Sequence, residues 1–231
     1  MKSTLIIATI LYAASFILGW SIANAQGIFV LELRLGFANA YAWLHQPFKT
    51  ISSAIIQSIF PWTQQPPSII LPLQTPSLSR IQTMEYLAVL SLVLFVMSLL
   101  YAFAATTLPG IVPVAGTILV GLVATVEGVA LGVRSSTAAQ FLSPFEFVPN
   151  IFLLSIIPIF LTFISEILTS SAGFHICFAT VQGEHGSRWL SFKDAWRDTL
   201  RIYVLAVTLL AIASAVDLIG YGVVLIVLPF F

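Results

Sequence analysis

The chain has 231 residues, of which 59% are hydrophobic and 8% charged, and its mean hydropathy is +1.04. Ordinary water-soluble domains do not have this composition, so we expect an integral membrane protein. Nine basic residues balance nine acidic ones, which leaves no basic patch for nucleic acid. The single cysteine, Cys177, excludes an internal disulfide and a site of paired cysteines.

Five apolar segments are long enough to cross a bilayer as helices, which takes about 20 residues each. We predict one all-α membrane domain, a polytopic helix bundle with spans at residues 5–24, 85–105, 111–133, 148–178 and 202–228. The first segment also resembles a secretory signal, because Ala23 and Ala25 form a small-residue cleavage pattern. Since the segment is present in the chain, we interpret it as a spanning helix; cleavage would leave four spans.

Residues 26–80 form an external segment with two parts. The first part predicts an amphipathic helix, with apolar residues on one side (Phe48, Ile51, Ile55, Ile59) and polar residues on the other (Lys49, Ser52, Ser53, Gln57). The second part, residues 61–80, has five prolines and is expected to be a loop outside the membrane. Packing of the amphipathic helix on its own bundle is the preferred interpretation, and a docking surface is the alternative.

Two shorter connections have predicted structures. Residues 106–110 contain Pro109 and are expected to form a tight turn between the second and third spans. Residues 181–201 are densely charged, and Ser191 with Asp194 is typical of a helix N-terminus. This segment is either a solvated helix face with Asp194–Arg197 and Asp198–Arg201 pairs or a docking surface formed by its basic residues, Arg188, Lys193, Arg197 and Arg201.

The basic residues also predict an orientation, since short cytoplasmic loops are enriched in Lys and Arg. Placing residues 181–201 in the cytoplasm puts Lys2 there as well. Residues 26–80 and the C-terminus then lie outside the cell membrane.

Small residues line one side of the third span and of the fourth. Gly121, Gly128 and Gly132 recur at helical spacing in the third span, and Gly173 lies in the fourth. Stripes of this kind let neighbouring helices approach closely. Glu127 lies at the edge of the first stripe, so its carboxyl group is expected to point into the bundle and to need a partner there.

Three intramembrane acids are candidates for a polar cluster. At 1.5 Å per residue, Glu127 and Asp217 both lie about 22 to 24 Å from the cytoplasmic side, and Glu166 reaches that level if its helix ends late. The full candidate cluster is Glu127, Glu166, Asp217, Thr162, Ser214 and Tyr221. Packing of the third span on the fifth through Gly128 and Ser214 would let Glu127 and Asp217 share a proton. The cluster either holds the helices together or binds protons or cations.

No catalytic or metal site is expected. The chain has no GxSxG, P-loop, HExxH or GxGxxG motif. His175 lies on the helix face opposite Glu166, and His45 and His185 are predicted to lie in loops on opposite sides of the membrane. We therefore predict no enzyme activity, no metal and no cofactor.

The order of features from Gly116 onward resembles the stage II sporulation protein M family of polytopic membrane proteins. The segments EGVALG, LTFISEILTSSAG and WRDTLRIYVLAVTLLAIASAVDL carry the resemblance, at residues 127–132, 161–173 and 196–218. They are similar to the family's NGxxxG-like motif, its PHGxxE motif and its alanine-rich end with an acid. Glu127 stands in place of the family's asparagine and Asp217 in place of its glutamate. The Pro-His-Gly triplet before Glu166 is absent, so roles of that histidine are not carried over.

The resemblance implies a function as well as a fold. In spore-forming bacteria the family is associated with an envelope-remodelling complex, in which the membrane protein is similar to an assembly partner of a secreted hydrolase. It implies a non-enzymatic subunit or assembly factor whose partners are the bilayer and other membrane-protein subunits or further copies of itself. The alternative is a small transporter coupled to protons or cations that uses the acid cluster.

Overall fold

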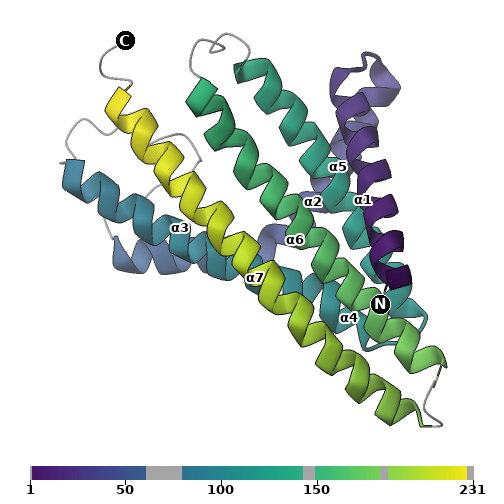
Figure 1. The fold of residues 1–231 in the computed structure, drawn as a ribbon. Coiled ribbons are helices and arrows are strands. Elements are labelled where there is room, and N and C mark those ends of the chain that lie inside the picture. The colour runs from purple at the N-terminus through teal and green to yellow at the C-terminus, as the bar shows by residue number, and fades with distance from the viewer. Residues whose placement is uncertain (1, 61–79, 143–148, 183–186, 228–231) are drawn as a thin grey trace.

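The computed structural model describes residues 2–60, 80–142, 149–182 and 187–227 (Figure 1). The proline-rich segment predicted to be a loop lies almost wholly outside the described residues. The helices in chain order are α1 (Lys2–Asn24), α2 (Ile28–Ile59), α3 (Arg80–Ala102), the π-helix η2 (Phe103–Thr107), α4 (Leu108–Gly110), α5 (Ala115–Leu142), α6 (Pro149–Gln182) and α7 (Arg188–Val227).

The protein is an all-α membrane bundle, as predicted. Within the described residues, five helical segments are long and apolar enough to span a membrane, namely Lys2–Asn24, Met84–Gly110, Ala115–Thr137, Ile156–Val181 and Arg188–Gly220. Figure 1 shows α1, α5, α6 and α7 side by side, whereas α3 is inclined to them. We call the two ends of the bundle the Lys2 end and the Asn24 end, after the residues at which α1 begins and ends.

The tight turn predicted at residues 106–110 is wrong, because the helix continues through them as η2 and α4. Pro109 lies in the last turn of this continuous helix, just before it ends at Gly110. The chain reverses after Gly110, and Val114 takes a left-handed conformation with φ 66°. The second span is therefore longer than predicted and α5 begins later.

The charged segment was predicted to start a helix at Ser191, and this is also wrong. α7 begins at Arg188 and continues without interruption to Val227. The Ser191 hydroxyl donates a hydrogen bond of 3.3 Å to the carbonyl oxygen of Ser187, one turn back, so it lies inside the helix and does not cap it. The charged segment and the last span are one helix.

α1 and α5 pack closely through glycines. A Cβ atom added at Gly132 would lie 2.2 Å from the carbonyl oxygen of Phe16, and one added at Gly128 would lie 2.7 Å from the Cβ atom of Ser15. Only glycine allows two helix backbones this near each other. A Cβ atom at Gly121 would meet side-chain atoms only at 4.0 Å, an ordinary contact. The small-residue stripe of α5 therefore faces α1 through its last two glycines.

A second close crossing joins α6 to η2 and α4. A Cβ atom at Gly173 would lie 2.1 Å from the carbonyl oxygen of Thr106, and one at Gly110 would lie 2.6 Å from that of Gly173. Gly173 thus brings the end of α6 onto the end of the second span. On its other side α6 packs along α7, and the hydroxyl of Ser165 donates a 3.1 Å hydrogen bond to the carbonyl oxygen of Ala206.

The described part of the external segment before the proline-rich part forms one long helix, α2, that packs between α3 and α5. Its start is tied to the end of α1, because the Arg34 guanidinium donates hydrogen bonds of 2.7 to 2.8 Å to the carbonyl oxygens of Ile22, Ala23 and Ala25. These carbonyls lack helical partners, so a cation is well placed there.

The buried face of α2 differs from the predicted one. Ser52 and Ile56 are buried, whereas Ile51 and Ile59 are about half exposed, at 50% and 49%. Ile56 packs with Val93 and Met97 of α3. The helical spacing was predicted correctly, but the buried face is shifted by about one residue, from Ile51 and Ile55 to Ser52 and Ile56. The reason is that α2 packs on α3 and also exposes apolar residues on its other side.

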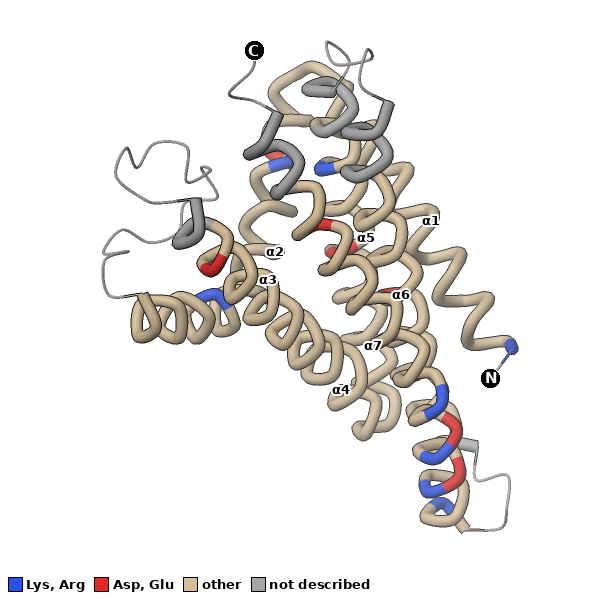
Figure 2. The backbone as a smooth tube through the Cα atoms, turned by 60° about the vertical axis from the view of Figure 1, so that its left-hand side comes forward, with Lys and Arg blue, Asp and Glu red and all other residues tan. Residues whose placement is uncertain are grey.

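The charged segment of α7 (residues 188–201) lies at the Lys2 end. Its buried side consists of Ser191, Ala195 and Thr199, one turn apart, while the basic residues Arg188, Lys193, Arg197 and Arg201 are exposed. Figure 2 shows acidic and basic residues alternating along this end of α7. The Asp198 carboxylate lies 4.0 Å from His175 Nε2 of α6. This contact places the start of α7 beside the end of α6.

Candidate functional site

Polar side chains of α2, α3 and α5 meet at Glu127. This residue is only 4% exposed. His45 of α2 places its Nε2 atom 2.7 Å from Glu127 Oε1, and the hydroxyl of Tyr101 on α3 donates a hydrogen bond to the same oxygen. A buried carboxylate needs such partners, because an unpaired charge in an apolar interior is strongly unfavourable.

The imidazole ring of His45 lies between two tyrosines. Its centroid is 4.1 Å from that of Tyr41 and 4.0 Å from that of Tyr101. Tyr41 precedes His45 by four residues, so both side chains are on one face of α2. The Tyr41 ring is covered in turn by the Arg134 guanidinium at 4.5 Å, and its hydroxyl accepts a hydrogen bond from Arg134. The stack joins the Asn24 end of α5 to Glu127.

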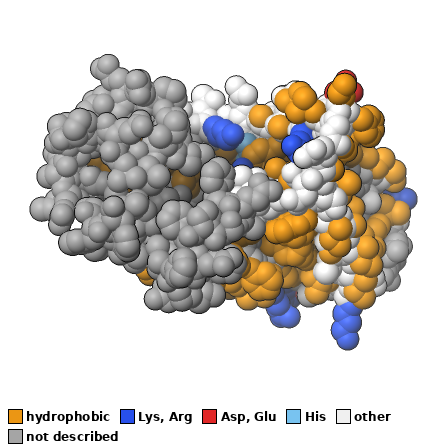
Figure 3. Space-filling model, turned by 90° about the horizontal axis from the view of Figure 1, so that it is seen from above, with side chains coloured by type: hydrophobic (Ala, Val, Ile, Leu, Met, Phe, Trp, Pro, Cys, Tyr) orange, Lys and Arg blue, Asp and Glu red, His pale blue; other side chains and the backbone are white. Residues whose placement is uncertain are grey.

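Arg134 and Glu127 lie on the same face of α5, because seven residues are close to two helical turns. Tyr41 therefore contacts a cation directly and lies near an anion. Burial raises the pKa of Tyr41 to about 12, an effect that Arg134 opposes and Glu127 reinforces. The hydroxyl of Tyr41 consequently stays protonated at neutral pH. Figure 3, which looks onto this part of the molecule, shows a histidine side chain near basic side chains.

A second acid, Glu166 of α6, lies near this cluster. Its Oε2 atom is buried and has no hydrogen-bond partner among the residues that the structure describes. It interacts electrostatically with Glu127. Tyr12 of α1 is fully buried and interacts with both acids, and its hydroxyl lies 3.4 Å from the Ser170 hydroxyl of α6. We call the set Tyr12, His45, Tyr101, Glu127 and Glu166 the interior polar cluster; it draws on α1, α2, α3, α5 and α6.

The expected partnership of Glu127 with Asp217 is not what the structure has. Gly128 faces Ser15 of α1, and α7 packs on α6 and α3. The backbone carbonyl of Ser214 accepts a 3.1 Å hydrogen bond from the Ser91 hydroxyl of α3. Asp217 has an exposed side chain. α6 lies between α5 and α7 in Figure 1, which is why the two acids belong to different faces of the bundle.

The other predicted members of the acid cluster divide in the same way. Glu166 belongs to the interior polar cluster, and Thr162, four residues earlier on α6, has a half-buried side chain. The side chain of Tyr221 lies outside the described residues. Two of the three predicted acids are therefore near each other, and the third is not with them.

His45, Tyr101, Tyr12, Tyr41 and Arg134 were not among the predicted site residues. His45 was predicted to lie in a loop, which is wrong, because it lies in the middle of the helix α2. The four-residue spacing of Tyr41 and His45 was a signal that these side chains share a face. The sequence does not show that Glu127 is the acid that His45 contacts, because the two residues are 82 positions apart.

The described part of the chain contains no group of three or more His, Cys, Asp and Glu residues able to hold a metal ion. The interior polar cluster instead brings an imidazole, two carboxyl groups and two phenols together. Carboxyl and imidazole groups can donate and accept protons, and all of these groups can hold helices together by hydrogen bonds.

Comparison of the chain with protein-family models, with curated proteins and with solved structures gave no match.

Proposed function

We propose that the protein is a non-enzymatic subunit or assembly factor of a larger membrane or envelope complex. The observation that carries this proposal is the charged segment of α7, whose basic side chains are exposed along a helix continuous with a span. Arg197 and Arg201 lie on one side of the helix, since four residues are about one turn. The segment also exposes Asp194 and Asp198, so its four basic residues outnumber two acids, and this net positive charge suits an acidic segment of another subunit. Segments within residues 127–218, which belong to α5, α6 and α7, resemble the stage II sporulation protein M family, and this resemblance supports the same function.

The proposed orientation puts this surface in the cytoplasm. Thr4 of α1 lies 3.3 Å from Ser171 of α6 through their hydroxyls, and His175 follows one turn later beside Asp198. Lys2 and the charged segment are thus at the same end of the bundle. A concentration of basic residues at one end favours the cytoplasmic side.

Affinity purification from native membranes in mild detergent, followed by mass spectrometry, tests the proposal. We expect membrane proteins or further copies of the chain to copurify with the wild-type protein. The double variant Lys193→Glu, Arg197→Glu should lose them, because it reverses two exposed charges. Lys2→Glu is the control, since it reverses an exposed charge at the same end. A wild-type protein recovered alone as a monomer would contradict the proposal.

A proton-coupled permease is the second candidate, and the interior polar cluster is the observation that favours it. Glu127 and Glu166 interact across the bundle, and a bound proton relieves the repulsion between two carboxylates. The unpartnered Oε2 atom of Glu166 is a free acceptor for that proton. His45, with 19% of its side chain exposed, connects Glu127 to the surface.

Proton flux into vesicles containing the purified protein tests the second candidate. Glu127→Gln and Glu166→Gln should each abolish flux, because the amide cannot carry the proton. Asp217→Asn removes an acid with an exposed side chain and should leave flux unchanged. Flux that is absent in the wild type, or equal in all four proteins, would exclude this function.

A further inference from the structure

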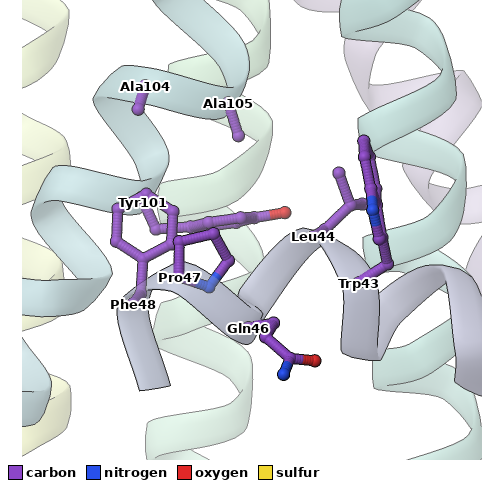
Figure 4. A pocket seen from close by; sticks show the side chains of 8 residues that line it. All are labelled: Trp43, Leu44, Gln46, Pro47, Phe48, Tyr101, Ala104 and Ala105. Atoms are coloured by element: carbon purple, nitrogen blue, oxygen red, sulfur yellow. The ribbon is translucent and has the colours of Figure 1, made fainter. Parts of the chain in front are cut away.

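A cavity of about 390 Å³ lies between α2 and the end of the second span. Figure 4 shows Tyr101, Pro47 and Phe48 on one side of it, Leu44 and Trp43 on the other, and the small side chains of Ala104 and Ala105 across from them. The eighth lining residue is Gln46. The lining is predominantly apolar and aromatic, and the volume falls within the range of about 300 to 1,000 Å³ typical of ligand sites.

Two local features of the backbone shape this cavity. Pro47 lies inside α2 and has no N–H, so it cannot donate a hydrogen bond to the carbonyl oxygen of Trp43. Opposite it, Ala104 and Ala105 belong to the π-helix η2, a form that is rare and often marks functional sites. Ala104 and Ala105 of η2 thus face the part of α2 that contains Pro47. Their small side chains leave the space between the two helices unfilled.

The mouth of the cavity borders exposed apolar side chains of a candidate membrane span. One wall belongs to the spanning segment Met84–Gly110, and Trp43 at the mouth is 76% exposed. Leu100 and Phe103, on the same spanning segment, are also exposed, at 48% and 36%. With Met84–Gly110 in the bilayer, a hydrocarbon chain would reach the mouth without crossing water.

We propose that this cavity binds one hydrocarbon chain of a membrane lipid. The hydroxyl of Tyr101 is already bonded to Glu127, so the ring presents an apolar face to the cavity. An apolar space of this kind offers water few hydrogen-bonding partners, and burial of apolar area favours a chain of methylene groups. The amide of Gln46 points away from the apolar walls in Figure 4. This amide and the carbonyl oxygen of Trp43, to which Pro47 cannot donate, mark the edge at which the polar head of the lipid would lie.

Photolabelling tests this inference with the full chain in phosphatidylcholine nanodiscs. The probe is a phosphatidylcholine with a diazirine on one acyl chain, and labelled peptides are identified by mass spectrometry. We expect label to concentrate on residues 43–48 and 101–105. Label spread evenly over other exposed apolar positions, such as Ile118 and Val204, would show ordinary surrounding lipid and overturn the proposal.

Variants that fill the cavity provide the second readout. Ala105→Trp should lower labelling of residues 43–48 about tenfold, because the indole occupies the volume in which the chain is buried. Ile118→Trp adds the same side chain at an exposed position of α5 outside the cavity and should leave labelling unchanged. If the Ala105→Trp protein has the helical content and the melting temperature of the wild type, unchanged labelling would contradict the proposal. If that variant does not fold, Ala104→Leu is judged by the same criterion.

Discussion

His45 and Glu127 are joined by a contact of 2.7 Å between the imidazole Nε2 and a carboxylate oxygen, across 82 residues of sequence. The contact fastens α2, which is not itself among the candidate spans, to the side of α5. A helix that would otherwise rest on the bundle thereby becomes part of its interior. The stability of the fold should therefore depend on this pair.

Glu127→Leu should lower the free energy of unfolding by about 1 to 3 kcal/mol, because it leaves the buried hydroxyl of Tyr101 and the half-buried His45 without their hydrogen-bond partner. Glu127→Gln keeps the shape and the hydrogen-bonding capacity, so we expect a loss of only about 1 kcal/mol. Chemical denaturation in detergent, followed by circular dichroism, measures both. Equal losses in the two variants would mean that the hydrogen bonds at Glu127 do not matter.

The coupling between the two side chains is measurable separately. His45→Ala and Glu127→Gln, made singly and together, form a double-mutant cycle, and we expect a coupling energy of about 0.5 to 3 kcal/mol for residues in direct contact. Gln46→Ala is the matched control in place of His45→Ala, since Gln46 is exposed beside it. Its cycle with Glu127→Gln should be additive.

Tyr101→Phe removes one hydroxyl and leaves the ring that stacks on His45. Because this hydroxyl donates to a buried carboxylate, its loss should lower the free energy of unfolding by about 1.5 to 3 kcal/mol. Tyr41→Phe should have a smaller effect, since the hydrogen bond that it removes, from Arg134, is solvent-exposed. Thermal unfolding in one detergent ranks the two. A larger loss of stability in Tyr41→Phe than in Tyr101→Phe would contradict the buried hydrogen bond between Tyr101 and Glu127.

Gly132→Ala should destabilise the protein by about 1 to 3 kcal/mol, because the new methyl group would collide with the Phe16 carbonyl and push α1 from α5. Gly121→Ala is the internal control on the same helix. Its methyl group meets only ordinary contacts, and alanine is the better helix former, by up to about 1 kcal/mol. Denaturation midpoints should therefore move in opposite directions, and a common direction would refute the assigned α1–α5 contact.

The proposed orientation predicts which engineered cysteines an impermeant maleimide reaches in intact cells. Ser58→Cys, at an exposed position near the end of α2, should react from outside. Lys193→Cys should react only after the membrane is opened. Cys177 is fully buried, so the native background should be low. The reverse pattern would invert the orientation.

The spans were predictable because each is a long apolar run, and a bilayer leaves such a run few alternatives to a helix. The glycine stripe of α5 likewise indicated a close neighbour. Neither signal names the neighbour: Gly128 and Gly132 accept any helix with small residues, and here that helix is α1 and not α7. Apolar periodicity cannot distinguish lipid from protein, since both sides of a membrane helix are apolar.

The interior polar cluster was half predictable for a related reason. An intramembrane acid such as Glu127 needs a partner, and that much follows from its sequence context. Its partner His45, however, lies in a segment whose hydropathy indicates no span, and only the packing of α2 between α3 and α5 brings it there. Ser52 is buried for the same reason, although its position in the sequence pattern suggested the polar side.

α7 is one uninterrupted helix of 40 residues, which at 1.5 Å per residue is about 60 Å long. A bilayer core is about 30 Å thick, so roughly half of this rod extends beyond it or is taken up by tilt. A partner that pulls on residues 188–201 would tilt the whole rod, since no loop absorbs the movement. The displacement would then appear farther along the rod, where the Ser214 carbonyl of α7 accepts a hydrogen bond from Ser91 of α3. One helix would in this way carry a movement of residues 188–201 into the interior of the bundle.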